Sequence, residues 1–436
     1  MTAAAAQSLR GNNARLLTAL WSALGTAVCL LAPRVSPALL ALSVVAPVAW
    51  IWDERARISW RKPSAVVNGL SLVGVYLLIN ASWSLSPADA YAIVTLFFIF
   101  VAILHVTLSA LNGVEPTGLR AMGAGFVAGT AVAGAVLCFE VLSEQWAHRL
   151  LMSYVPQLRI DPRRMQIDAG WVTYVMPHLL NRSMTMLALF FWPAILAINQ
   201  LALPHRQRLL LVAVLSLVVP AIFWSDHETS KLAFAAAAVI YAIARFFPLL
   251  ANRLTIAAWM AATLLVVPLT ALAYDNQLYQ AGWLPQSARH RIVIWGYTSA
   301  QVAKAPLVGV GISTARALHD PNNANLPRAP GTEIAFAIAL HSHNAYLQVW
   351  YEAGAVGALF LLGIGLLVLR KMAQAATAIQ PHLHATFASC AVLAGSSFSI
   401  WAPWFMAALV LTPILVMLGK LLCPARPQSA IAKQRS

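Results

Sequence analysis

The sequence predicts an all-α polytopic integral membrane protein, and its composition and apolar runs carry that prediction. Of the 436 residues, 60% are hydrophobic and only 10% are charged, whereas a soluble domain carries about 25% charged residues. The mean hydropathy is +0.72. Apolar runs of about 17–25 residues can cross a hydrocarbon layer of ~30 Å as helices, and lipid leaves the backbone no other spanning structure except a closed barrel. Soluble enzymes, nucleic-acid readers, disulfide scaffolds and outer-membrane barrels, whose strands alternate in polarity, are therefore excluded.

Charges, prolines and glycines divide a single membrane domain, residues 1–436, into about twelve predicted helices. The predicted spans are 14–32, 36–52, 64–83, 89–110, 121–143, 183–203, 208–224, 231–248, 254–274, 344–369, 384–400 and 404–423. With the N-terminus inside, 17 of the 29 Lys and Arg residues fall in inner segments. Inner loops of membrane proteins carry such an excess, so both termini are expected to be cytoplasmic. The net charge of +15 is then explained by orientation and anionic lipid rather than by nucleic acid.

Two outer segments, near 144–182 and 275–343, are longer than the other outer loops and hold ten basic residues between them. Long loops in compact proteins are usually functional or disordered. Helical patterns, Trp and Tyr in both segments favour function, and we expect two helical segments outside the membrane.

The second outer segment carries a predicted amphipathic helix that ends before Pro306. Arg291 and Trp295 are spaced i, i+4 and share one face, as on a helix lying at a membrane surface. Gly309 and Gly311 follow the proline. A lone G-x-G is a weak signal for a phosphate cradle, and a plain turn is the simpler interpretation.

His341, His343 and Asn344 stand at the mouth of the next predicted span. Histidines at such a position can snorkel to water, bind a metal or act as a general base. The outer segments show no further cluster at metal-ligand spacing, and no D-x-D motif occurs. General-base chemistry is the sharper hypothesis, with Asn344 fixing a neighbouring backbone or substrate group. No metal and no cofactor is expected.

Two helix starts carry further charges. Arg182 opens the sixth predicted span, where a cation opposes the helix dipole and needs an anionic partner; anchoring to lipid phosphate is the alternative. Asp226 and Glu228 precede Lys231 at the eighth span. These carboxylates are more often caps and dipole partners than cation ligands.

Taken together, these motifs resemble the O-antigen ligase and polymerase superfamily. The resemblance rests on Arg291-x-x-x-Trp295, Pro306-Leu-Val-Gly309-Val-Gly311, and His343-Asn344-x-x-Leu347 followed by Glu352-x-Gly354-x-x-Gly357. Their order on one outer segment is more specific than any single motif.

The resemblance implies a GT-C-like glycosyltransferase at the periplasmic face of the bacterial inner membrane. Its ligase branch transfers a glycan from undecaprenyl pyrophosphate to lipid A–core without metal or nucleotide. By position, Arg291 matches the family's essential outer-loop arginine and His343 its histidine, with His341 as near neighbour. The family's Ser-Arg pair before the loop is Ser230-Lys231 here, and lysine lacks the bidentate fork.

The expected roles follow from a metal-free diphosphate site. His343, with His341 second, would be the base. Arg291 would grip pyrophosphate, since charge grows on that leaving group. The predicted supporting groups for pyrophosphate and glycan are Arg182, Arg289, Lys231, Asn344 and Trp295. Arg159, Arg163 and Arg164 are expected to meet acceptor phosphates, or to form a solvated basic face.

Other functions remain open on the sequence alone. An O-antigen polymerase or a protein O-oligosaccharyltransferase of the same superfamily shares the donor and differs in the acceptor. A secondary transporter or lipid flippase belongs to another class, but such proteins usually place ionisable groups at mid-membrane. His105 and Glu140 instead sit toward the ends of predicted spans.

Overall fold

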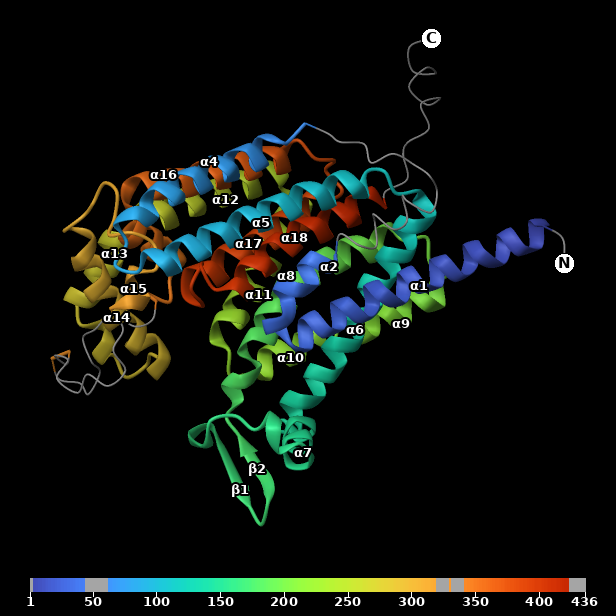
Figure 1. Cartoon of the computed structure of the whole chain (residues 1–436), viewed down its shortest axis with the longest axis horizontal. Helices are drawn as coiled ribbons and strands as arrows, with labels where there is room; N and C mark the ends of the chain where they lie inside the picture. The colour runs from blue at the N-terminus through green and yellow to red at the C-terminus, as the bar shows by residue number, and fades with distance from the viewer. Residues whose placement is uncertain (1–2, 44–61, 319–328, 331–340, 423–436) are drawn as a thin grey trace, which may run out of the picture. The chain divides into compact units, whose positions relative to one another are not determined.

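The computed structural model describes residues 3–43, 62–318, 329–330 and 341–422, with side chains from Asn13 onward. The chain divides into two compact units, each built from segments distant in sequence. The first unit comprises residues 1–61, 106–231 and 411–436. The second comprises 62–105 and 232–410. Figure 1 shows the elements of both.

The first unit is a helical bundle whose centre is α8. Its helices are α1 (Ala3–Leu31), α2 (Ser36–Leu42), α6 (Pro116–Leu142), α7 (Trp146–Tyr154), α8 (Asn181–Gln200), α9 (His205–Leu215) and α10 (Val218–Trp224). Most of α8 is buried, including Met184, Leu187 and Phe190. The long helix α1 packs along α6.

Between α6 and α8 the chain forms a small module that includes a β-hairpin. After α7 come two short 3-10 turns, Pro156–Leu158 and Pro162–Arg164, and the antiparallel strands β1 (Met165–Asp168) and β2 (Trp171–Val175). Figure 1 shows the hairpin extending beyond the end of α6. The prediction of a helical segment at 144–182 is therefore wrong in part. Its cause is the two-residue turn at Ala169 and Gly170, both with positive φ, which joins β-favouring residues into a hairpin.

The second unit holds the remaining helices. They are α4 (Ala65–Asn80), α5 (Pro87–Leu111), α11 (Glu228–Phe246), α12 (Pro248–Leu264), α13 (Val266–Asp275), α14 (Gln286–Val302), α15 (Thr314–Ala317), α16 (Ala345–Ala373), α17 (Gln380–Ser396) and α18 (Pro403–Leu421). Helices α5, α11 and α18 each continue into the first unit. The core near α4 and α16 is formed by Leu77, Val94, Ile312 and Val349.

The described residues contain nine single helices long and apolar enough to cross a membrane, plus the pair α12 and α13, bent by 65°. The chain is thus a mostly helical, polytopic membrane protein. Twelve spans stay a prediction. The predicted span 36–52 lies outside the described residues after Ser43, and α17 has 17 residues. Residues 275–318, 329–330 and 341–343 of the predicted loop 275–343 are described, and α14 lies where a surface helix was predicted.

Candidate active site

Helix α14 presents Arg291 and Trp295 one turn apart in the second unit. Its neighbouring residues Ile292 and Val293 are buried and pack with Tyr279, which fixes the rotation of the helix. The indole Nε1 of Trp295 donates to the carbonyl oxygen of Ser342 at 2.8 Å. Trp295 therefore ties α14 to the segment that carries both histidines.

The two histidines lie together directly before α16. Their ring centroids are 4.1 Å apart, and His343 has a left-handed backbone with φ of 54°. That conformation costs a non-glycine residue about 1–2 kcal/mol, and such strain persists only where surrounding contacts hold it. Here the backbone N–H of His343 donates to Nδ1 of His341 at 3.1 Å. The ring Nδ1 of His343 lies 2.9 Å from the carbonyl oxygen of Ser397.

These two contacts define the tautomers. A carbonyl oxygen only accepts, so Nδ1 of His343 carries the proton and its Nε2 keeps a lone pair. Conversely, Nδ1 of His341 accepts from a backbone N–H, so a neutral His341 carries its proton on Nε2. One imidazole is thus arranged as a proton acceptor at Nε2 and the other as a donor.

The electrostatics of the site favour neutral imidazoles beside a fixed cation. Burial lowers the pKa of His341 to about 3, and the charges of His343 and Arg291 add to that shift. Burial also lowers the pKa of His343, opposed by its bond to Ser397 and reinforced by Arg291. Burial lowers the pKa of the Arg291 guanidinium as well, but arginine stays protonated in proteins. Near neutral pH the site therefore combines a positive charge with an unprotonated Nε2.

Asn344 positions this segment by capping α16. Its Oδ1 accepts from the backbone N–H of Leu347 at 3.1 Å, and its carbonyl oxygen accepts from Ser342 Oγ at 2.7 Å. An N-cap satisfies a backbone donor that the helix itself leaves free. Asn344 thus fixes a neighbouring backbone group, one of the two roles considered from its sequence position.

Helix α16 is broken at Gly354, and the loop after Pro306 fills the break. Four backbone hydrogen bonds join them: Ala355 N to Pro306 O (2.8 Å), Val356 N to Leu307 O (3.1 Å), Val310 N to Tyr351 O (3.1 Å) and Gly311 N to Glu352 O (2.9 Å). The loop thereby satisfies backbone groups that the break would leave unpaired. In this structure the G-x-G stretch is a turn packed against α16.

Only glycine fits at this contact. Gly309 has φ of 70° and Gly354 of 64°. A Cβ at Gly309 would lie 2.4 Å from the carbonyl carbon of Glu352, and one at Gly354 would lie 2.4 Å from that of Leu307. The two glycine motifs of the sequence are therefore two sides of one backbone junction.

A buried polar network supports the junction, and most of its members were missed from the sequence. The carboxylate of Glu352 accepts from Trp401 Nε1, from Gln348 Nε2 at 3.2 Å and from the backbone N–H of Ala315 at 3.2 Å. Asn80, at the end of α4, donates to Val308 O and accepts from Ile312 N, both at 2.9 Å. Asn80, Gln348 and Trp401 stand near the ends or breaks of apolar helices. A polar side chain near the end or break of an apolar helix was the sequence signal that could have identified these three residues.

An apolar cavity of about 740 Å³ adjoins the site. Asn344 and Tyr346 line it together with residues of α11, α12, α13 and α17 such as Ile240, Trp259 and Phe387. Its volume is in the range of cavities that hold small-molecule ligands. Within the described stretches, no three His, Cys, Asp or Glu side chains are grouped so that they could hold a metal ion.

The other predicted residues of the second unit and its border have local partners. Arg289 shares α14 with Arg291, but its Nε donates to the carbonyl oxygen of Tyr279 at 2.7 Å. Lys231, at the border between the units, pairs with Glu228 at 2.7 Å. The structure thus brings together Arg291, Trp295 and the histidine pair, and gives Arg289 a different contact.

In the first unit, four predicted arginines lie around the hairpin module. Arg182 begins α8, near the charges of Arg34 and Arg164. Arg159 donates to the carbonyl oxygens of Met152 and Gly170 at 3.0 and 2.8 Å. Arg163 is exposed and pairs with Asp161 at 2.9 Å, and this guanidinium lowers the pKa of that carboxyl. Arg159 therefore braces the hairpin, whereas Arg163 and Arg164 face solvent.

Fold and site together define a polytopic helical membrane protein with a cationic, histidine-containing site at the N-terminus of one long helix, α16. Residues 211–362 match the family model described as O-antigen ligase, a range that includes Lys231, Arg291, Trp295 and both histidines. This match and the relatives described below confirm the resemblance to the O-antigen ligase family that the sequence motifs indicated.

Curated relatives agree with this family. A Rickettsia felis protein named "Putative polysaccharide ligase" is 27% identical over 254 residues, covering 55% of this chain and 59% of the relative. A Rickettsia prowazekii protein of the same description is 26% identical over 250 residues, again 55% of this chain and 59% of the relative. The chain thus matches less than two thirds of the length of these relatives.

Proposed function

We propose that this protein is an inverting, metal-independent glycosyltransferase that transfers O-antigen polysaccharide from undecaprenyl pyrophosphate to a terminal sugar of lipid A–core. The observation that carries the proposal is an unprotonated Nε2 on His343 beside the guanidinium of Arg291. A buried base and a fixed cation are the two groups that glycosyl transfer from a diphosphate needs in the absence of a metal.

His343 is the proposed catalytic base. Its Nε2 would take the proton of the acceptor hydroxyl as that oxygen attacks C1 of the donor sugar, and a positioned general base gives about 10²–10⁴-fold. His341 already uses Nδ1 as an acceptor and holds its proton on Nε2. It therefore acts in this proposal as a positioning residue that orients His343.

Arg291 is the proposed binder of the leaving pyrophosphate. As the C1–oxygen bond breaks, its electron pair passes to the diphosphate, which leaves with one more negative charge. A guanidinium can bind phosphate oxygens bidentately, and a charge-stabilising donor of this kind typically lowers the barrier by about 2.7–4 kcal/mol. Single displacement inverts the anomeric carbon, and the imidazolium then returns its proton to water.

The remaining predicted residues take supporting roles in the proposal. Trp295 holds the histidine segment through Ser342, and Asn344 fixes the start of α16. Arg182 and Lys231 would add positive charge for the diphosphate, whereas Arg289, which donates to the Tyr279 carbonyl oxygen, would contribute only weakly. Exposed Arg163 and Arg164 would meet acceptor phosphates, with Arg159 acting through the hairpin.

A lipid-linked donor agrees with the apolar cavity beside Asn344, because a polyprenyl chain requires an apolar environment next to the polar site. The proposal includes the bacterial inner membrane, with both termini cytoplasmic and the site facing the periplasm. The excess of inner Lys and Arg supports this orientation.

The test supplies purified full-length protein in proteoliposomes with labelled glycan on undecaprenyl pyrophosphate and one acceptor at a time. Label on lipid A–core, with an inverted anomeric linkage, is expected. Label on a second lipid-linked glycan would replace the proposal with a polymerase, and label on an acceptor protein with an oligosaccharyltransferase. Movement of donor across the bilayer without transfer would indicate a flippase.

A further inference from the structure

The hairpin module of the first unit, residues 143–176, is held rigidly by side chains that bind its own backbone. Arg149 donates to the carbonyl oxygens of Thr173 (2.8 Å) and Ser143 (3.1 Å), and Gln145 Nε2 donates to Val175 O at 3.0 Å. Ser153 Oγ accepts from Val172 N at 2.8 Å. Helix α7 and strand β2 are thus joined by a ladder of polar contacts.

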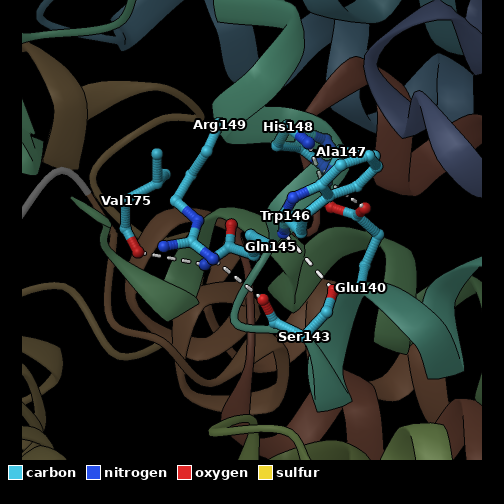
Figure 2. A network of polar contacts seen from close by, with 8 residues as sticks. All are labelled: Glu140, Ser143, Gln145, Trp146, Ala147, His148, Arg149 and Val175. Atoms are coloured by element: carbon cyan, nitrogen blue, oxygen red, sulfur yellow. Dashed lines mark hydrogen bonds and ion pairs between the residues drawn. The ribbon is translucent and has the colours of Figure 1, made fainter. Parts of the chain in front are cut away.

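The base of the module is equally fixed. Figure 2 shows the carboxylate of Glu140 at the end of α6 receiving the backbone N–H groups of Ala147 and His148 and contacting the His148 ring. Glu144 and Gln145 both have positive φ, a conformation that costs a non-glycine residue about 1–2 kcal/mol. These two residues form the turn between α6 and α7. The turn places the side chain of Gln145 within hydrogen-bond distance of β2.

This rigid framework displays an exposed aromatic pair. The rings of Tyr154, at the end of α7, and Trp171, at the start of β2, meet edge to face with centroids 5.4 Å apart. Tyr154 is 70% exposed and Trp171 is 50% exposed. Arg159 lies beside them, because its guanidinium donates to Gly170, the residue before Trp171. Large exposed aromatics on a preorganised scaffold mark a binding surface.

Tyr154 and Trp171 lie outside the candidate membrane spans, between the span that ends at Leu142 and the one that begins at Pro177. The next span begins at Pro177, and the hairpin points away from α6 (Figure 1). The five residues of β2 rise by about 3.3 Å each, so Trp171 lies up to ~17 Å along the strand from the start of that span. The interfacial zone of a bilayer is only about 5–8 Å deep on each side.

We propose that Tyr154 and Trp171 form a saccharide-binding platform. Sugar rings present C–H faces that pack on aromatic rings, and their hydroxyls accept from guanidinium N–H groups such as those of Arg159. Rigid aromatic side chains give such contacts at little cost in conformational entropy. The inference rests on the proposed function for its partner, a polysaccharide held outside the membrane while one end reacts.

The test measures binding of lipid-free polysaccharide, released by mild acid from lipopolysaccharide of the strain that carries this chain, to the full-length protein in detergent. Tyr154→Ala and Trp171→Ala are each expected to weaken the Kd about fivefold, as loss of one aromatic contact of roughly 1 kcal/mol predicts. Trp171→Phe is expected to retain binding. Trp146→Ala is the matched control, because Trp146 is also 50% exposed but packs on Phe139, away from the pair.

Unchanged binding in both alanine variants, an equal loss in Trp146→Ala, or no binding by the wild type would overturn the platform. Tyr154 is the most exposed side chain of the pair, so Tyr154→Ala keeps the test valid if Trp171→Ala fails to fold. Quenching of Trp171 fluorescence by brominated phospholipids, taken as the difference from Trp171→Phe, would assign the pair to lipid and also overturn it.

A transfer assay on the same preparations separates the two proposals. Glycan transfer by wild type and variants without an effect on polysaccharide binding leaves the proposed function and removes the platform. Polysaccharide binding that depends on Tyr154 and Trp171, in a protein without transfer activity, leaves the platform and removes the proposed function.

Discussion

The backbone N–H of His343 donates to Nδ1 of His341 at 3.1 Å, so one histidine of the pair sets the geometry of the other. This bond can form only while Nδ1 of His341 is unprotonated. It therefore links the protonation state of His341 to the left-handed backbone of His343.

The two histidines are expected to respond differently to substitution. His343→Ala removes the proposed base and should lower transfer by about 10²–10⁴-fold. His341→Asn should lower it far less, because the Asn side chain keeps an acceptor near the His343 N–H. Initial transfer rates check this, with melting temperature as the control for folding. Near-normal turnover in His343→Ala would remove it as the base.

The two arginines of α14 form a matched pair for testing the cation. Arg291→Lys keeps the charge but loses the bidentate fork, and Arg291→Ala loses both. We expect the alanine variant to lose about 10²–10³-fold in the transfer rate. Arg289→Ala should stay within a few fold, since Arg289 binds the backbone of Tyr279. Equal losses for the two alanine variants would contradict the separate roles.

Guanidinium groups in place of a metal ion predict transfer that continues in EDTA. We expect the rate in excess chelator to match the rate in buffer, and added magnesium or manganese to leave it unchanged. A positive control, a metal-dependent glycosyltransferase in the same buffer, shows that chelation is complete. Restoration of a lost rate by either ion would contradict the proposed chemistry.

Local periodicity was enough to predict the helices and part of the site. The spacing of Arg291 and Trp295 placed both on one face, as α14 confirms, and the apolar runs predicted the long helices. The hairpin was missed because β1 and β2 have four and five residues. Their pattern is too short to stand out beside helical signals.

Long-range contacts explain what local patterns could not show. Asn80 meets the loop after Pro306 across more than 220 positions of sequence, and no local pattern reports such a contact. The pairing of Gly309 with Gly354 is also tertiary. Local sequence predicted a turn at Gly309 and placed Gly354 within the span 344–369.

The glycine junction predicts a steep stability effect at one position of α16. Gly354→Ala would place a Cβ 2.4 Å from the Leu307 carbonyl in a left-handed conformation. Strain and overpacking together should cost about 2–5 kcal/mol. Gly363→Ala is the control in the same helix, since nothing lies within 4 Å of its Cβ position. It should be neutral or stabilising by up to ~1 kcal/mol. The melting temperatures of the two variants are compared in detergent. Equal values would contradict the prediction that only glycine fits at position 354.

Acidification is expected to destabilise the protein partly through His341. Burial lowers its folded pKa from 6.5 to about 3, so between these values the unfolded chain binds a proton that the folded chain does not. The stabilising contribution is therefore complete above about pH 6.5 and is lost as the pH falls toward 3. Between pH 7 and 5, the melting temperature of His341→Asn should fall less than that of the wild type. Identical slopes in the two proteins would show that His341 titrates alike in the folded and unfolded chain.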